Sequence, residues 1–314
     1  MKTLNEVYSS LSARRRYEVW FIRLGLADGA GAWWFRYLLM NPGRSGCPGE
    51  PRGMPVQVWA TWFPRDSKPQ TFIQGFSLAG LELSPRSQNP FHLQIANNEI
   101  GQSSCRGALE VDGHAVSWRL EYRSTFRVTL SNKGWIGFSR APHSNARFSG
   151  TITLDDRVFE GNPLGFGLQG HNCGYRHRGF WNWAHAYFPG PEGSSSTLEA
   201  LVYDMPLGLV FRRAVLWHDG QRYSFRKLQE MVKDRGNFRW AFSCGVREGL
   251  QLEVEFDGHG PSLHRLPYLK TDCSGSFEVT NNSLCGAVVK LKSANKAIET
   301  LETSGGAVLE MSGV

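Results

Sequence analysis

Short runs of alternating side chains recur through most of this sequence and restrict it to a β fold. Runs rich in Val, Ile, Thr, Phe, Tyr and Trp begin at Tyr17 and are separated by turns containing Gly, Pro, Asn or Asp. This pattern is typical of short antiparallel strands. Helical spacing of apolar residues occurs only at 1–14 and 225–235. We therefore predict an all-β protein with few peripheral helices.

The chain is long enough for two such domains. Its 314 residues, 41% of them hydrophobic, suffice for two separate cores. A weak internal repeat supports two similar halves, because VWF at 19–21 and WWF at 33–35 resemble FWNW at 180–183 and the strand-like run at 198–203. We predict an N-terminal β domain over 1–160 and a C-terminal β domain over 161–314. Closure into antiparallel barrels or sandwiches would protect the strand edges.

One strand-like run carries an unusual row of aromatic side chains. Alternation places Trp181, Trp183, His185 and Tyr187 on one face of the strand, opposite a face made of Asn182, Ala184, Ala186 and Phe188. Such a row is either a thick layer of core or the wall of an apolar ligand cavity. The sequence leaves both interpretations open.

The glycine-rich segment before this run has the residue spacing of a dinucleotide-binding motif but not its structural context. Gly165 to Gly170 reads G-x-G-x-x-G, but no βαβ unit surrounds it and Pro163 precedes it. We interpret it as a connection between the domains whose glycines adopt positive φ angles. The separations of His171, His177 and His185 match no common zinc pattern, so we expect no metal.

Polar groups suited to proton transfer lie within this aromatic context. They are Glu18, His171, Asn172, His185, Tyr203 and Asp204. Burial raises the pKa of a carboxyl group and lowers that of histidine, so an apolar cavity can hold an acid that is protonated near neutral pH. Arg23 and Arg36 lie in aromatic strands, where they either meet an oxyanion of a ligand or pair with a carboxylate such as Glu18. The alternative for every one of these groups is a hydrogen-bonded place in the core.

Charge and cysteine content limit the partners. The formal charge of +7 is spread along the chain and accompanies no known nucleic-acid-binding motif, so we expect no nucleic-acid partner. No uncharged apolar stretch of about twenty residues occurs, which predicts neither a membrane span nor a signal peptide and favours a cytoplasmic location. The six cysteines form no C-x-x-C pair and are expected as free thiols. The oligomeric state is not predicted.

Four fragments together resemble the two-domain lipocalin-like family of acyclic carotenoid hydratases, AttH-type proteins, and lipocalin-like cyclases and Diels-Alderases. They are RYEVWF at 16–21, GHNCG at 170–174, WNW at 181–183 and VYD at 202–204. The family's second motif reads Asp-His-Asn-Trp-Gly, so Gly170 and Cys173 depart from it, and Val202 stands where Tyr is expected. Of the residues implicated in carotenoid hydration, only His171 and Asp204 are matched.

The resemblance implies two lipocalin-like barrels or sandwiches around a hydrophobic small molecule such as an isoprenoid, polyketide or prenylated metabolite. The activity it implies is a cofactor-independent cyclisation or isomerisation, or addition of water as in a hydro-lyase; the alternative is a binding protein without chemistry. We predict His171 as general acid and Asp204 as the group that orients or exchanges its proton. The predicted substrate-binding residues are Trp20, Arg36, Asn172, Trp181, Trp183, His185 and Tyr203.

Overall fold

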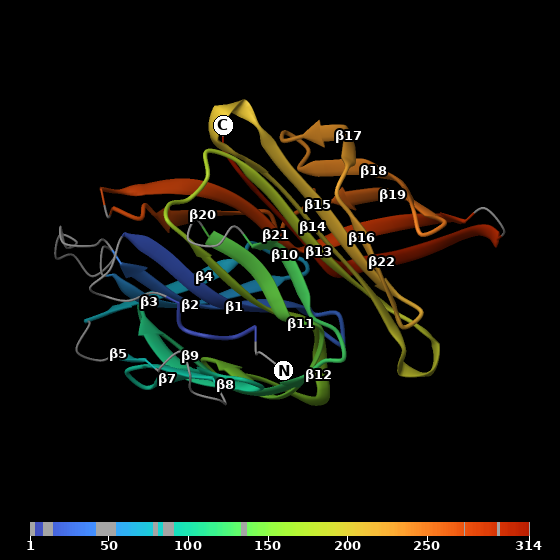
Figure 1. The fold of residues 1–314 in the computed structure, drawn as a ribbon. Coiled ribbons are helices and arrows are strands. Elements are labelled where there is room, and N and C mark those ends of the chain that lie inside the picture. Colours follow the sequence, from blue (N-terminus) through green and yellow to red (C-terminus); the bar gives the residue numbers. More distant parts are fainter. Residues whose placement is uncertain are drawn as a thin grey trace.

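The computed structural model describes residues 4–8, 15–41, 55–77, 81–83, 91–132, 137–272, 274–293 and 296–313. Their regular structure is almost entirely antiparallel strand, which confirms the all-β prediction, and the helical elements among them are two 3-10 turns, η5 (Pro191–Gly193) and η6 (Pro206–Gly208). The strands form two sheets (Figure 1). The first contains β1 (Arg16–Leu26), β2 (Gly31–Asn41), β3 (Val56–Pro64), β4 (Gln70–Phe76), β5 (Leu81–Leu83), β6 (His92–Ile95), β7 (Asn98–Gly101), β8 (Ser104–Val111), β9 (His114–Arg123), β10 (Val128–Asn132), β11 (Gly137–Leu154) and β12 (Arg157–Gly174). The second contains β13 (Trp181–Pro189), β14 (Ser195–Asp204), β15 (Val210–His218), β16 (Gln221–Phe225), β17 (Leu228–Asp234), β18 (Arg239–Arg247), β19 (Leu250–Asp257), β20 (His264–Leu269), β21 (Ser276–Ser293) and β22 (Lys296–Ser312).

Both sheets follow the same plan. In the first, the strand order is β4-β3-β2-β1-β12-β11-β9-β8-β7-β6-β5, with β10 paired to β11. In the second, it is β16-β15-β14-β13-β22-β21-β19-β18-β17, with β20 paired to β21. Each sheet therefore places its first strand beside its last, β1 against β12 and β13 against β22. This shared order is the structural counterpart of the sequence repeat.

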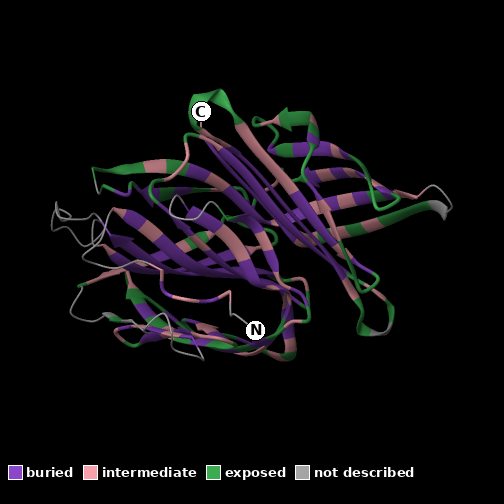
Figure 2. Ribbon diagram, viewed as in Figure 1, coloured by how far each residue is buried: buried purple, intermediate pink, exposed green. Residues whose placement is uncertain are grey.

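Three apolar clusters hold the fold together. One lies on the inner face of the first sheet and one on the inner face of the second. The third joins the sheets and includes Val19 and Phe21 of β1 together with Trp181 and Trp183 of β13. Figure 2 shows the continuous buried stretches along these central strands. Alternation explains the separation, because Trp20 and Ala184 point into the inner cores while their chain neighbours point toward the other sheet.

The helix predicted at 225–235 is wrong, because this segment ends β16 and forms β17. A register shift between Glu230 and Val232 interrupts the two-residue alternation in β17. The spacing of Leu228, Met231 and Val232 in the sequence looks helical, but Met231 and Val232 are exposed and form no buried face. Of the helix predicted at 1–14, residues 4–8 are described and are not helical, and the other positions lie outside the described residues.

The glycine-rich segment is part of β12 and is not a connection between domains. Its glycines are needed for close strand approach rather than for positive φ: a Cβ at Gly167 would lie 1.9 Å from the Arg23 carbonyl oxygen. A Cβ at Gly165 would lie 2.1 Å from the Gly25 oxygen. The predicted boundary at 160/161 falls inside β12, whose residues through Gly174 pair with β1. We propose that the domains divide between Gly174 and Trp181.

Candidate functional site

A cavity of about 120 Å³ lies between the two sheets. One water molecule needs about 10–15 Å³, so the cavity has room for several waters or for part of an organic molecule. The first sheet contributes the outward face of β1, with Tyr17, Val19 and Phe21, and the second contributes Trp181 and Trp183. Because side chains alternate along both strands, these apolar groups face one another across the domain junction. The aromatic face of β13 is therefore a cavity wall.

Arg36 of β2 is the most unusual group in this wall. Its side chain is only 5% exposed, and its Cζ lies 4.0 Å from the ring centroid of Tyr268 and 4.6 Å from that of Trp59. Its Nε and Nη1 are buried without a hydrogen-bond partner among the described residues. A buried N–H group without an acceptor loses its hydration without compensation. An oxygen atom of a ligand in the cavity would supply the missing acceptor.

Glu310 of β22 is the carboxyl group of the cavity. Its Oε1 accepts from Trp181 Nε1 at 2.8 Å, and its Oε2 accepts from the Tyr268 hydroxyl at 2.7 Å and from Asn281 Nδ2 at 3.4 Å. Burial raises the pKa of Glu310 above its ordinary value, opposed by the charge of Arg36 and by the donated hydrogen bonds. The group is therefore held in a fixed position and binds a proton more readily than an exposed carboxylate.

Two further polar groups of the lining are His177 and Tyr203. The His177 ring stacks on Tyr17 at a centroid distance of 4.2 Å, and its buried Nδ1 has no hydrogen-bond partner among the described residues. Burial, together with the charge of Arg36, lowers the pKa of His177 to about 3, so the imidazole is neutral at physiological pH. The Tyr203 hydroxyl lies 2.8 Å from Ser131 Oγ, and Arg178 lies over its ring.

Five of the predicted site residues line this cavity: Arg36, Asn172, Trp181, Trp183 and Tyr203. Two others, Trp20 and His171, point to the opposite face of the first sheet, into its inner core. His185 is fully buried beyond the lining, and its Nε2 lies 2.8 Å from the Ser144 carbonyl oxygen. Asp204 lies outside the lining and accepts a hydrogen bond from the Phe180 backbone N–H at 3.0 Å.

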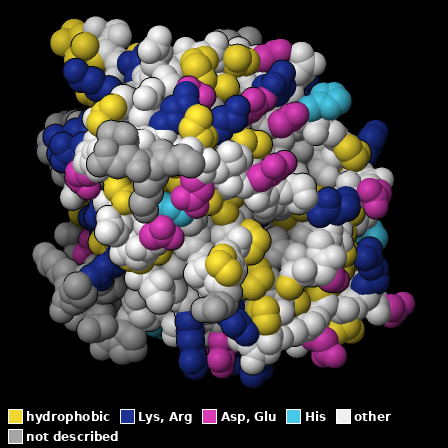
Figure 3. Space-filling view, turned by 90° about the vertical axis from the view of Figure 1, so that its right-hand side faces the viewer, with side chains coloured by type: hydrophobic (Ala, Val, Ile, Leu, Met, Phe, Trp, Pro, Cys, Tyr) yellow, Lys and Arg dark blue, Asp and Glu magenta, His cyan; other side chains and the backbone are white. Residues whose placement is uncertain are grey.

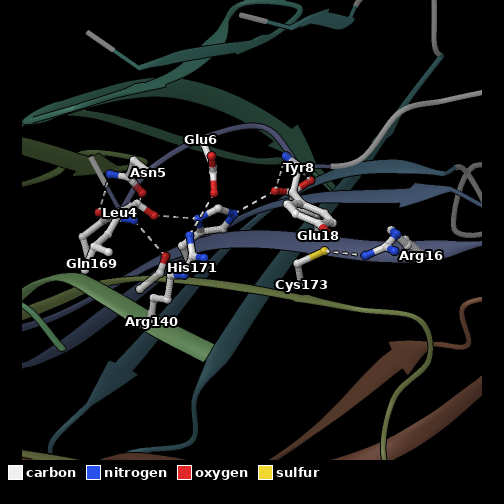
Figure 4. Close-up of polar contacts among 11 residues, drawn as sticks. Leu4, Asn5, Glu6, Tyr8, Arg16, Glu18, Arg140, Gln169, His171 and Cys173 are labelled. Carbon is white, nitrogen blue, oxygen red and sulfur yellow. Dashed lines mark hydrogen bonds and ion pairs between the residues drawn. The ribbon is translucent and has the colours of Figure 1, made fainter. Parts of the chain in front are cut away.

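His171 instead forms a buried pair with Glu18 (Figure 4). Its Nε2 lies 2.8 Å from Glu18 Oε1, and its Nδ1 lies 3.2 Å from the Leu4 carbonyl oxygen. Neither side chain is exposed, and the Glu18 carboxylate also accepts from the Tyr8 backbone N–H. Asn5 exchanges hydrogen bonds with Gln169 beside the pair. Residues 4–8 thus cover this end of the first sheet's core, and the pair faces protein on every described side.

Among the cavity residues that sequence reasoning missed are three that carry polar groups: Glu310, Tyr268 and His177. Glu310 offered a signal, because it is a single carboxylate inside the apolar run at 307–311 and a β-strand must place it among buried side chains. Tyr268 and His177 carried no comparable signal. Their contribution depends on β20 and the segment after β12 folding back over the junction.

No protein-family model and no curated protein matches the sequence. Among solved structures, CghA with Sch210972 aligns with a TM-score of 0.59 at 11% identity, over 96% of this chain and 89% of CghA. Kievitone hydratase from Nectria haematococca aligns with a TM-score of 0.57 at 10% identity, over 98% of this chain and 92% of the hydratase. These similarities confirm the lipocalin-like two-sheet fold that the sequence resemblance predicted. No helix in the described residues is long and apolar enough to cross a membrane.

Proposed function

We propose that the protein binds a hydrophobic small molecule carrying a carbonyl or anionic oxygen in the cavity between the sheets, and catalyses its cyclisation or isomerisation without a cofactor. The observation that carries this proposal is the guanidinium of Arg36, which is buried in the cavity wall and whose Nε and Nη1 have no acceptor among the described residues. The aromatic side chains around it suit an isoprenoid, polyketide or prenylated aromatic skeleton. The aligned structures include a hydratase and CghA with Sch210972, which supports an enzymatic role for the chain.

The cavity residues divide the chemical work. Arg36 polarises a carbonyl or stabilises an enolate, which makes the conjugated system of the ligand more electrophilic. Glu310, held by Trp181 and Tyr268, gives or takes the proton that an isomerisation requires. Trp34, Trp181 and Trp183 fold the chain of the ligand so that its reacting atoms meet, which lowers the entropic part of the barrier.

This assignment moves the proton-transfer role from His171 to Glu310. His171 and Asp204 stay candidates from the sequence resemblance, but Glu310 reaches the cavity and neither of them does. Their expected contribution is structural. Turnover by folded His171→Asn and Asp204→Asn variants at a rate close to that of the wild type would support the reassignment.

Two fluorescent probes test the binding step. Anilinonaphthalene sulfonate is a hydrophobic anion, and N-phenylnaphthylamine is a neutral molecule of similar shape. The variant Arg36→Met keeps the length of the side chain and removes its charge, so we expect about a tenfold weaker affinity for the anion and little change for the neutral probe. Equal affinities of the variant and the wild type for the anion would refute the role of Arg36.

Mass spectrometry of molecules that co-purify with the protein tests the chemical step. The identified ligand, or its linear precursor, would then be incubated with wild type and with Glu310→Gln. Loss of general acid–base catalysis is expected to slow turnover by about 100-fold or more while ligand affinity changes little. Tight binding with the ligand recovered unchanged from the wild type would identify a carrier instead of an enzyme.

A further inference from the structure

The turn between β14 and β15 holds an exposed leucine in a strained conformation. Leu207 is 96% exposed and adopts φ 65° and ψ 27°, the left-handed region that L-residues other than Gly, Asn and Asp rarely occupy. Leu209 at the end of the same turn is 58% exposed. The turn is closed by a hydrogen bond from the Met205 N–H to the Leu209 carbonyl at 2.8 Å. Two leucines are thus held out from the protein.

Basic side chains lie near the start of this turn. The Phe180 N–H donates to Asp204, the residue just before the turn, and the Phe180 ring lies 4.5 Å beneath Lys233 Nζ. The pKa of Lys233 is lowered by desolvation and by the nearby charges of Arg235 and Arg212, against the opposing effect of Glu230. In the upper part of Figure 3, hydrophobic side chains stand beside Lys and Arg side chains, with Asp and Glu side chains among them.

Basic side chains outnumber carboxylates in this region. The cations near the turn and at the adjacent cavity lining are Arg176, Arg178, Arg212, Lys233 and Arg235. Among the described residues, the carboxylates of the same region are Asp204, Glu230 and Asp234, which accept hydrogen bonds from neutral donors, so five cations face three negative charges. The region therefore combines protruding leucines with a positive electrostatic potential.

The turn also borders the cavity. Tyr203, in the strand that leads into the turn, lines the cavity and stacks on Phe211, in the strand that leaves it. Arg178 lies over the Tyr203 ring. The exposed leucines, the basic side chains and this part of the cavity wall thus lie at the same end of the second sheet.

We propose that this end of the molecule docks on the surface of a lipid bilayer that contains anionic lipids. Leu207 and Leu209 would enter the head-group region, and Arg178, Arg212, Lys233 and Arg235 would lie against lipid phosphates and carboxylates. Short apolar insertions combined with basic side chains are a known physical basis for peripheral, reversible membrane binding. A hydrophobic ligand would then pass from the bilayer to the cavity along Tyr203 with little exposure to water. The docking itself does not depend on the chemistry proposed for the cavity.

Vesicle flotation tests this docking with the purified full chain. Vesicles of phosphatidylcholine alone would be compared with vesicles in which about one third of the lipid is phosphatidylserine. We expect binding to the anionic vesicles that weakens with added salt, and at least about tenfold weaker binding by Leu207→Asp. Leu207→Gly removes the side chain at a position where glycine adopts the observed φ freely, so a similar loss in this variant excludes an effect of turn distortion.

A matched control and a charge variant decide the outcome. Ile298 is another exposed apolar residue, 62% exposed in β22, and Ile298→Asp should bind vesicles as the wild type does. Replacing Arg212 and Lys233 by Glu should weaken binding to anionic vesicles, with an unchanged far-UV spectrum and thermal midpoint. Failure of the wild type to float with anionic vesicles overturns the proposal, as does equal binding by Leu207→Asp and the wild type. The leucine turn would then be a contact for another protein.

Discussion

The two sheets share one strand order but place their buried carboxyl groups on opposite faces. In the first, Glu18 of β1 and His171 of β12 point inward, under the segment 4–8. In the second, Glu199 of β14 and Glu310 of β22 lie on the face that meets the first sheet. The inner face of β13 instead carries Ala184 and Ala186. Topology alone therefore does not place a reactive group, because a shift of one residue along a strand moves it to the other face.

This difference is the reason for placing the proposed chemistry at the junction. The Glu18–His171 pair is enclosed in the first core, where each group is the hydrogen-bond partner of the other. Removing one of them leaves the other buried without its partner. A carboxyl group at the junction faces empty volume and a cation on the other sheet, so it can respond to a ligand. Substitutions in the two sheets should therefore differ in their effects on stability and on turnover.

Removal of one member of the enclosed pair should cost the most stability. Glu18→Ala leaves His171 Nε2 and the Tyr8 N–H without their acceptor in the core, and we expect a loss of about 3–5 kcal/mol in the free energy of unfolding. Urea denaturation measures it. The double variant Glu18→Leu with His171→Phe should recover much of the loss, because both polar groups are then absent. A loss below about 1 kcal/mol would place the pair among weak surface ion pairs and would remove the contrast between the sheets.

Glu199 should make the stability of the second sheet depend on pH. Burial raises its pKa from 4.5 to about 7, opposed by the hydrogen bond from Trp183 Nε1. The folded state therefore holds a proton that the unfolded state has already released, so the contribution of Glu199 to stability is full below pH 4.5 and is lost as pH rises through about 7. The loss amounts to about 3 kcal/mol. Buried neutral histidines such as His177 contribute a pH dependence of the opposite sign, so the measurement is the difference in unfolding free energy between wild type and Glu199→Gln, which should change by this amount across the range.

An exposed carboxylate provides the matched control for this pH dependence. Glu302 is exposed, so Glu302→Gln should keep the slope of the wild type. If Glu199→Gln keeps the same slope as well, another group is responsible. Glu310, the other carboxyl of the junction, would then be the next candidate, because its pKa is also raised.

The sequence predicted the fold better than the site for a physical reason. Alternation and turn residues are local signals, and they identified several strands of each sheet and the aromatic row of β13, while leaving open whether that row is core or cavity wall. The location of His171 depends on which face of β12 meets which neighbour, and its pairing with Trp20 of β1 directs it inward. Glu310 and Tyr268 reach the cavity through contacts between strands far apart in the chain. Such long-range contacts leave almost no trace in a local pattern.

The two sheets also differ in the strand that closes them: β12 carries a glycine that β1 closely approaches, and β22 carries large side chains. Substitution of that glycine should reduce stability by a moderate amount. β12 brings Gly167 against the Arg23 carbonyl of β1, whereas β22 presents Val308 and Leu309 to β13. Because the obstructing atom is backbone, Gly167→Ala must displace a strand, and we expect about 2–3 kcal/mol of destabilisation in thermal or urea unfolding. Gly245→Ala is the control, since a Cβ there meets no atom within 4 Å. Equal stability of the two variants would show that β12 tolerates a wider spacing.

The smallest loss of stability is expected on substitution of Asp204. Comparing stability with turnover in such a variant distinguishes a structural role of Asp204 from a catalytic one. The carboxylate accepts the Phe180 N–H at the start of β13, so Asp204→Ala removes one partly buried hydrogen bond. A loss of about 1 kcal/mol in unfolding free energy is expected, with unchanged binding of the neutral probe N-phenylnaphthylamine. Because Asp204 lies outside the cavity lining, turnover of an identified substrate should change less than in Glu310→Gln. A reversal of that order, with Asp204→Ala the slower enzyme at equal stability, would return the proton-transfer role to the residue that the family motif predicts.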